Sequence, residues 1–204
     1  MKLYHHPLSP NCSRVSLTAA VLGLDLEHQL VDFSKGEHKA PAFLAINPNG
    51  ALPALVDGDF ALTESRAIMQ YLASKKPEAG LLPRDERGRA EVTRWQFWDA
   101  SHWSPALSTI AFERVMKGMM GMGAADEAKV QENLKSFRRW AAVLDGALAG
   151  KQYLVGNTLT VADLTLASSL RYAKQSEVPL AEFGNIESWF GRITALDGWK
   201  ETSV

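Results

Sequence analysis

Over the first eighty residues, apolar positions follow two different periods, which predicts a mixture of strands and helices. Residues 2–4 form a short β-like run, and the stretch SRVSLTAAVLGL, from residue 13, repeats its apolar side chains at helical spacing. The loop between them, HHPLSPN, is dense in turn-forming residues. A second strand is predicted over residues 27–33, followed by a short helical piece over residues 41–46.

The next elements are a β-hairpin and a helix. The segment ALPALVDGDFAL holds two short apolar runs separated by Asp57-Gly58, a dipeptide typical of hairpin turns. TESRAIMQYLAS follows as an amphipathic helix, with Thr63 or Glu64 near its start. The first part of the chain is therefore predicted to be a βαβ unit followed by a ββα unit.

The pattern changes after residues 75–85, KKPEAGLLPRD, which contain two prolines and a glycine. From residue 86 onward, apolar residues recur at three- and four-residue intervals, as they do in helical bundles. One aromatic-rich stretch there is predicted to be a long helix broken near Pro105. We therefore predict an α/β domain over residues 1–76, a linker over 77–85 and an all-α domain over 86–204.

Composition excludes several classes of protein. The chain has 204 residues, 46% of them hydrophobic and 22% charged, and no apolar run reaches the roughly 18 residues of a membrane span. A formal net charge of −1 gives no general attraction to nucleic acid or anionic lipid. The N-terminus lacks the apolar core of a signal peptide, and the single cysteine, Cys12, cannot form an internal disulfide. A cytoplasmic protein with no nucleic-acid or membrane partner is expected.

The first candidate for chemistry is Ser9-Pro10-Asn11-Cys12, between the first strand and the first helix. Amides at a helix N-terminus favour an anion such as a thiolate. The S-x-x-C spacing matches the C-x-x-C of thioredoxin-like redox proteins, with serine in place of the exposed cysteine. The Ser9 hydroxyl would then hydrogen-bond the sulfur of another molecule. Alternatively, Ser9 only caps the helix, and Cys12 is a small buried apolar residue.

Leu52-Pro53 begins an apparent strand, where a proline requires an edge position, a turn or a cis peptide. In a thioredoxin-like fold, a cis proline at this point exposes the backbone of the preceding residue beside the start of the first helix. A plain edge proline explains the sequence equally well.

Two pairs of polar residues could hold the ends of a charged ligand. Glu64-Ser65 opens a helix, so the amides near Ser65 could bind a carboxylate and Glu64 an ammonium group, although both could simply cap the helix. His38-Lys39 could place a cation on a second carboxylate, or the two residues could be ordinary solvated loop residues.

In order along the chain, HPLSPNCSRV, GEHKAPAFLAINPNGALPALVDGDFALTESRAIMQYLA and VGNTLTVADL resemble the cytosolic glutathione transferases. The first two segments resemble the serine-type phi, theta and related bacterial classes most. This resemblance implies a thioredoxin-like N-terminal domain that binds glutathione and a helical C-terminal domain that presents an electrophile.

The resemblance also implies roles for individual residues of the first domain. Ser9 becomes the catalytic residue, whose hydroxyl stabilises the glutathione thiolate and lowers the thiol pKa from about 8.5 toward neutrality. The implied glutathione contacts are His38 and Lys39 at the glycyl carboxylate, Leu52 with cis Pro53 at the cysteinyl backbone, and Glu64 with Ser65 at the γ-glutamyl group.

Four positions qualify these assignments. Ala51 stands where the phi pattern has a glutamine that contacts glutathione, and Asn49 replaces the phenylalanine of the N-P-F-G turn. Asn11 is a second candidate for the sulfur contact, because bacterial relatives sometimes use an asparagine near this loop. Cys12 falls three residues into the helix, off the usual nucleophile position, so a mixed-disulfide mechanism is the less favoured alternative.

In the second domain, residues 157–163 resemble the capping box of the family, in which Thr160 caps a helix and the Asp163 carboxylate reaches back to its backbone. The middle of the aromatic helix is implied to line the electrophile pocket. The resulting pocket candidates are Trp103 and Leu107, with Leu8 from the first loop.

The expected activity is glutathione transfer, in which glutathione, as co-substrate, attacks a small apolar electrophile without any metal. A homodimeric detoxification enzyme is implied by the resemblance. Two alternatives remain: glutathione-dependent peroxide or disulfide reduction at the same site, and a non-catalytic module that binds glutathione for an interaction.

Overall fold

The computed structural model describes residues 1–202, which fall into two compact units. The first contains residues 1–82 together with 195–202, and the second is Pro83–Thr194. The division between residues 82 and 83 falls within the predicted linker. The C-terminal residues, in contrast, are predicted by the sequence to lie in the helical domain but belong with the first unit.

The C-terminal residues join the first unit because of one short helix. Helix α10 (Asp197–Glu201) packs on α1 (Pro10–Val21). A glycine permits this approach, since a Cβ atom at Gly198 would lie 2.9 Å from the Cβ of Ala20. The five residues of α10 are too few for a pattern of apolar side chains to indicate this contact in the sequence.

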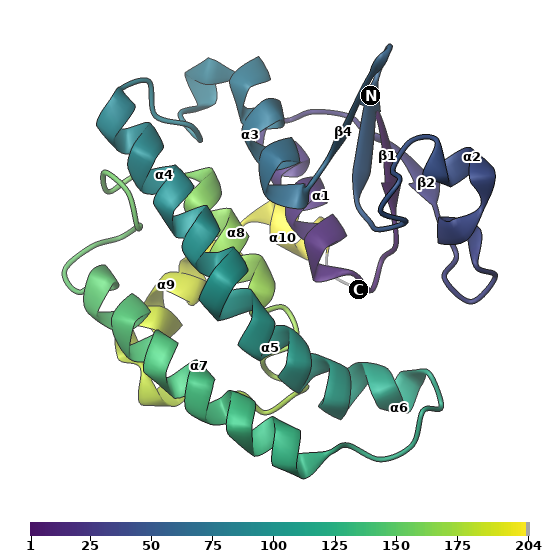
Figure 1. The fold of residues 1–204 in the computed structure, drawn as a ribbon. Helices are drawn as coiled ribbons and strands as arrows, with labels where there is room; N and C mark the ends of the chain where they lie inside the picture. The colour runs from purple at the N-terminus through teal and green to yellow at the C-terminus, as the bar shows by residue number, and fades with distance from the viewer. Residues whose placement is uncertain (203–204) are drawn as a thin grey trace. The chain divides into compact units, whose positions relative to one another are not determined.

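A four-stranded mixed sheet, in the order β2-β1-β3-β4, forms the centre of the first unit (Figure 1). β1 and β2 are parallel and connected through α1, whereas β3 is antiparallel to both of its neighbours. The thioredoxin-like prediction is confirmed. The strands are β1 (Lys2–His5), β2 (Glu27–Leu30), β3 (Ala54–Asp57) and β4 (Phe60–Thr63).

Helices cover both faces of this sheet, with α1 and α3 on one side and α2 on the other (Figure 1). Leu3 pairs with Leu55, and both are fully buried. Their neighbours Tyr4 and Ala54 point to the opposite face and pack with Phe43 of α2. The remaining helical elements of this unit are η1 (Glu37–Lys39), α2 (Pro41–Leu44), α3 (Ser65–Lys75) and η2 (Pro77–Ala79).

The second strand is shorter than predicted, because a side-chain turn ends it at Leu30. Oδ1 of Asp32 accepts hydrogen bonds from the N–H and hydroxyl of Ser34 at 2.9 and 2.6 Å. The Asp32 N–H donates to Oε2 of Glu37 at 2.7 Å. Phe33 therefore lies in a closed turn rather than in a strand, and 41% of its surface is exposed.

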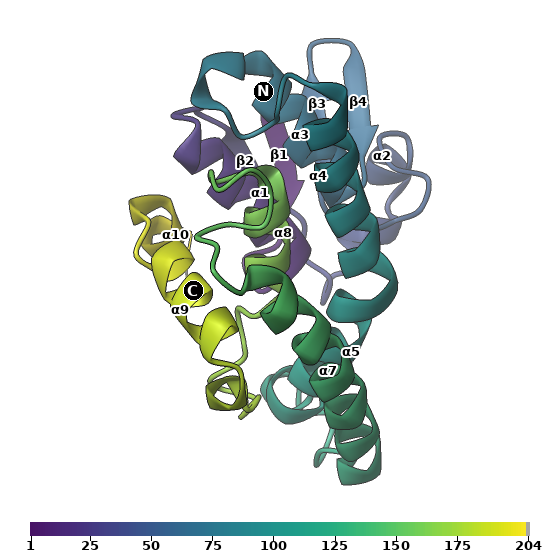
Figure 2. The same cartoon turned by 90° about the vertical axis from the view of Figure 1, so that its left-hand side faces the viewer.

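The second unit is all α, as predicted, and Figure 2 shows α8 between α4 and α9. Its elements are α4 (Glu86–Trp98), η3 (Asp99–Trp103), α5 (Ser104–Ala111), η4 (Phe112–Met116), α6 (Lys117–Met119), α7 (Glu127–Leu148), α8 (Val161–Ser169), η5 (Leu180–Glu182) and α9 (Gly184–Thr194). Among the helices of residues 1–202, none combines the length and the apolar character needed to cross a bilayer.

The predicted break near Pro105 is wrong, because α4 to α6 follow one another with no loop between them (Figure 1). A proline removes one helical N–H and its ring crowds the carbonyl four residues earlier. A wider π-helical turn over Asp99–Trp103 immediately precedes Pro105. This turn accommodates the ring, and the helix continues.

Candidate functional site

Two of the predicted site segments leave the sheet at the same edge because β1 and β2 are parallel. His5 at the end of β1 lies opposite Leu30 at the end of β2. The loop after β1 carries Ser9, and the chain after β2 leads to His38 and Lys39 in η1. Both segments therefore begin at the carboxyl ends of neighbouring strands.

The other two segments reach this edge through β3. Ala54, the first residue of β3, pairs with Tyr4 of β1 and with Thr63 of β4. Because β3 is antiparallel to both strands, its first residue lies beside the last residues of β1 and β4. Leu52-Pro53, just before β3, and Glu64, just after β4, therefore lie at the edge of the sheet where β1 ends. The sheet register thus gathers the predicted glutathione-binding segments of the first unit along one edge.

Ser9 is the N-cap of α1, in extended conformation (φ −85°, ψ 117°). Its hydroxyl oxygen accepts the N–H of Cys12 at 3.4 Å, and its carbonyl accepts the N–H of Ser13 at 2.9 Å. A serine hydroxyl can accept one hydrogen bond and still donate another. Capping is therefore compatible with donation to a thiolate, which the positive end of α1 also favours. Asn11 is exposed in the first turn of the same helix.

Cys12 is a buried thiol with 1% of its surface exposed, and its Sγ accepts the N–H of His6 at 3.4 Å. Burial raises the pKa of this thiol above its ordinary value, and this effect outweighs the hydrogen bonds with Ser9 and His6, which lower it. Thiolate reactivity requires the opposite environment, exposed and electropositive. Cys12 thus has the character of a packing residue.

The Leu52-Pro53 peptide bond is cis. The loop before it is held by Asn47, which is 2% exposed. Nδ2 of Asn47 donates to the carbonyl of Ala51 at 2.7 Å, and Oδ1 accepts the N–H of Asn49 at 3.1 Å. Sequence reasoning missed Asn47, although an asparagine that opens an N-P-N-G turn is a recognisable signal for such bonds.

Glu64 has a left-handed backbone, with φ 66° and ψ 107°, and its exposed side chain makes no capping hydrogen bond. A non-glycine residue in this region costs on the order of 1 to 3 kcal/mol, and such strain concentrates at ligand sites. Capping therefore does not explain Glu64. Ser65, the first residue of the 11-residue helix α3, is 4% exposed. The first amides of such a helix have no intrahelical acceptor and suit a carboxylate.

His38 and Lys39 occupy η1, which follows the left-handed Gly36 (φ 69°). Lys39 is exposed. Nδ1 of His38 is buried and has no hydrogen-bond partner. The turn before the cis proline packs against η1, since a Cβ atom at Gly50 would lie 3.0 Å from the carbonyl oxygen of His38. These two site segments therefore support one another.

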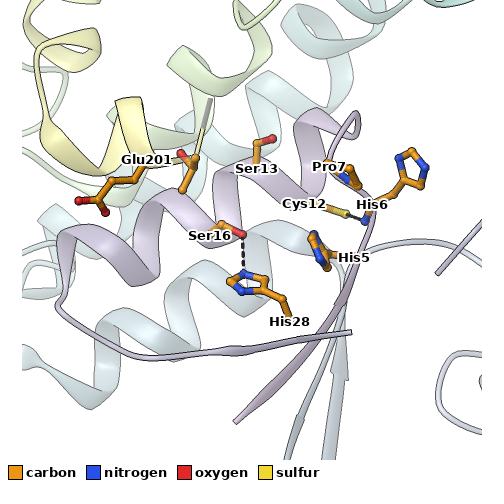
Figure 3. A pocket seen from close by; sticks show the side chains of 9 residues that line it. His5, His6, Pro7, Cys12, Ser13, Ser16, His28 and Glu201 are labelled. Atoms are coloured by element: carbon orange, nitrogen blue, oxygen red, sulfur yellow. Dashed lines mark hydrogen bonds between the residues drawn. The ribbon is translucent and has the colours of Figure 1, made fainter. Parts of the chain in front are cut away.

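A separate cavity of about 350 Å³ opens among β1, β2, α1 and α10 (Figure 3). The rings of His5 and His28 lie 4.8 Å apart there, and Nε2 of His28 is 3.2 Å from the hydroxyl of Ser16. Burial, followed by the neighbouring imidazoles, lowers the pKa of His5. None of the predicted glutathione contacts lines this cavity, and within residues 1–202 no group of three or more His, Cys, Asp or Glu residues could hold a metal ion.

The three pocket candidates fall in different surroundings. Trp103 and Leu107 are 0% and 3% exposed, and Nε1 of Trp103 donates to the carbonyl of Leu166 at 3.1 Å. They lie in the core of the helical unit and offer an electrophile almost no accessible surface. Leu8 is half-buried, and its N–H donates to Nδ1 of His6 at 3.3 Å.

Thr160 and Asp163 form a capping box at the start of α8, and both are fully buried. Oδ2 of Asp163 accepts the N–H and the hydroxyl of Thr160, both at 3.0 Å. Oδ1 accepts the N–H of Leu154 at 2.9 Å and Nε1–H of Trp189 at 3.0 Å. One carboxylate therefore ties together three segments of the helical unit.

Comparison with protein-family models matches residues 1–74 to the glutathione S-transferase N-terminal domain and residues 103–197 to the C-terminal domain. Among curated proteins, glutathione S-transferase 3 of Zea mays is 37% identical over 207 residues, which covers 99% of this chain and 92% of the relative. Glutathione S-transferase of Hyoscyamus muticus is 34% identical, with 98% and 96% covered.

Solved structures give the same result. Glutathione S-transferase I bound with the ligand lactoylglutathione has a TM-score of 0.91 and 32% identity, with 99% of this chain and 97% of that chain covered. Glutathione transferase F7 from Populus trichocarpa has a TM-score of 0.90 and 29% identity, with 98% and 96% covered. This protein belongs to the glutathione S-transferase family.

Proposed function

We propose that this enzyme, a glutathione transferase, uses Ser9 to stabilise the sulfur of glutathione as a thiolate. The observation that carries the proposal is the position of Ser9 as N-cap of α1, on the sheet edge where Leu52-Pro53 and Glu64-Ser65 also lie. The thiolate at this point gains a hydrogen bond from the hydroxyl and the favourable end of the helix dipole.

The reaction is a nucleophilic attack by sulfur. The thiol proton of bound glutathione passes to solvent, and the thiolate forms a carbon–sulfur bond with a small apolar electrophile. In a substitution the leaving group departs with the bonding electron pair, and in an addition the neighbouring atom takes a proton from water. The protein contributes charge stabilisation and orientation rather than a covalent intermediate.

The ends of glutathione are held by charged groups and by hydrogen-bond donors. The Glu64 carboxylate faces the ammonium of the γ-glutamyl unit, and the amides at Ser65 receive its carboxylate. His38 and Lys39 receive the glycyl carboxylate, and the backbone of Leu52 pairs with the cysteinyl unit. The strained backbone of Glu64 and its lack of a capping bond support this role.

Turnover of glutathione with an activated aryl halide tests the activity, and Glu64→Ala tests the proposed contact of Glu64 with the γ-glutamyl ammonium group. We expect the natural enzyme to form conjugate and Glu64→Ala to raise KM for glutathione about tenfold, because hydrogen bonds to a charged group are worth roughly 1.5 to 3 kcal/mol. Glu78→Ala, at an exposed glutamate of the same unit, serves as the matched control and should leave KM unchanged. Retention on immobilised glutathione without turnover of any electrophile would instead favour a binding module, and an unchanged KM in Glu64→Ala would refute the assigned grip.

The alternative of thiol–disulfide or peroxide reduction has no support from Cys12, whose thiol is buried and whose pKa is raised. The free thiol of Cys12 is compatible with a reducing compartment, and we propose a cytoplasmic location. Fractionation of the source cells tests that location, and recovery in a secreted fraction would contradict it.

A homodimer is also part of the proposal, and exposed apolar side chains on neighbouring helices of the second unit support it. Phe97 of α4 is 69% exposed and Val143 of α7 is 48% exposed. The rings of Trp98 and Trp140, from the same two helices, meet edge to face at 6.2 Å. A contiguous apolar patch on such helices would mark a contact surface.

The dimer is tested by molar mass in solution. We expect light scattering to give twice the mass of the chain, and Phe97→Glu to reduce it to the mass of one chain, because a buried unpaired carboxylate is costly. Met120→Glu, at a 62% exposed position of the same unit, should remain dimeric. A natural protein that elutes with the mass of a single chain would exclude this part of the proposal.

A further inference from the structure

Phe33 lies between two imidazoles that belong to different parts of the site. Its ring centroid is 5.4 Å from that of His6, with the planes at 46°, and 4.8 Å from that of His38, with the planes at 58°. Tilted ring pairs at these separations are attractive beyond the area they bury. One phenylalanine ring thus connects the loop before α1 with η1.

Phe33 contacts the imidazole of His38, which is proposed to receive the glycyl carboxylate of glutathione. Nδ1 of His38 is buried and has no hydrogen-bond partner. A buried donor without an acceptor is rarer in proteins than a buried acceptor without a donor. The proton of the neutral ring is therefore expected on Nε2, the nitrogen that remains to donate to a carboxylate. A fixed ring orientation is needed for Nε2 to point at that ligand.

Phe33 also contacts the imidazole of His6, which lies in the loop that carries Ser9. Nδ1 of His6 accepts the N–H of Leu8 at 3.3 Å, and the carbonyl of His6 accepts the N–H of Ser9 at 3.0 Å. The N–H of His6 donates to Sγ of Cys12 at 3.4 Å. Backbone and ring of His6 together set the path of this loop.

Phe33 itself sits on a rigid support. The turn that carries it is closed by the hydrogen bonds of Asp32 with Ser34 and Glu37, and the N–H of Gly36 donates to the carbonyl of Phe33 at 3.1 Å. Hydrogen bonds from Ser34, with a smaller contribution from Lys35, lower the pKa of Asp32 to about 2. The turn therefore keeps its charge and its bonds throughout the neutral range.

We propose that Phe33 is a positioning residue for glutathione binding, whose ring fixes the imidazole of His38 and, through His6, the loop of Ser9. This inference rests on the proposed function. The ring is 41% exposed and contacts both imidazoles.

Substitution of Phe33 tests the inference. We expect Phe33→Ala to raise KM and Kd for glutathione about tenfold, because two ring contacts are lost. The kcat at saturating glutathione should change less than about twofold, because the backbone hydrogen bonds of His6 with Cys12 and Ser9 still hold the Ser9 loop. Phe33→Tyr keeps the ring and should restore both constants to within about twofold of the natural enzyme. Leu30→Ala, which removes another exposed apolar side chain three residues earlier, should bind glutathione normally.

Nuclear magnetic resonance of the imidazole nitrogens adds a measurement that needs no glutathione. The natural protein and Phe33→Tyr should show His38 with its proton on Nε2, and Phe33→Ala should show exchange between the two tautomers. A folded Phe33→Ala variant with unchanged glutathione affinity, or a Phe33→Tyr variant that does not restore it, would overturn the role of the ring. Failure of the natural protein to bind glutathione would overturn the proposed function, and this inference with it, even if the tautomer of His38 responds as expected.

Discussion

Ser9→Ala is expected to lower kcat for conjugation of an activated aryl halide by roughly 100-fold, in line with the loss of one hydrogen-bond donor to a developing or bound anion. Affinity for glutathione should remain close to that of the natural enzyme, because the contacts proposed at Glu64-Ser65 and at η1 stay intact. Steady-state kinetics with both substrates varied, together with calorimetric binding of glutathione, measures the two effects separately.

The matched control is Cys12→Ser, a change at the only cysteine and in the same helical turn that keeps an acceptor for the N–H of His6. The thiol of Cys12 is buried, which disfavours its ionisation to the thiolate, so turnover should stay near that of the natural enzyme.

In Ser9→Ala, loss of the hydrogen bond that caps α1 should also lower the free energy of unfolding by about 1 kcal/mol, which thermal unfolding detects. Unchanged turnover in Ser9→Ala would move the sulfur contact to Asn11 or Cys12.

Asp163→Ala is expected to lower the free energy of unfolding by about 3 to 5 kcal/mol, because it leaves several buried donors without an acceptor. The N–H groups of Leu154 and Thr160 and the indole N–H of Trp189 all donate to this carboxylate. For a chain of this length the midpoint of thermal unfolding should fall by about 10 °C. Denaturant and thermal unfolding measure the effect.

Asp163→Asn keeps the size of the side chain but changes its hydrogen bonds, so it separates the contribution of the hydrogen bonds to stability from that of packing. An amide oxygen can replace Oδ1 for Leu154 and Trp189, but the amide nitrogen cannot accept from Thr160. Stability should therefore lie between that of Asp163→Ala and the natural protein. Asp197→Ala, whose carboxylate is 92% exposed, should be neutral. An Asp163→Ala variant of normal stability that has lost glutathione affinity would contradict the structural role.

The sequence predicts the fold well because the two periods of its apolar residues match the two units. The alternation around Leu3 and Leu55 and the Asp57-Gly58 turn are local signals, and the structure contains the strands they predict. The position of the C-terminal helix could not be predicted in this way, because its contact with α1 depends on the missing side chain of Gly198.

Family motifs predict the candidate site residues, and the sheet register brings their segments to one edge, whereas long-range side-chain contacts leave no local signal in the sequence. The residues alone leave open whether Pro53 is cis, because an edge strand tolerates the same proline. The pattern places Phe33 in a strand, since the turn formed by Asp32 and Glu37 involves side chains rather than turn-forming dipeptides. An aromatic residue at helical spacing looks the same in a core and in a pocket, and Trp103, predicted to line the electrophile pocket, is fully buried.

The most direct test of the central claim is the pKa of the thiol of glutathione bound to the enzyme. Thiolate absorbance in the ultraviolet, recorded against pH for the complexes of the natural enzyme and of Ser9→Ala, measures it. We predict a pKa well below the free-thiol value of about 8.5 in the natural enzyme and a return toward that value in Ser9→Ala. Equal pKa values in the two complexes would contradict the role of Ser9.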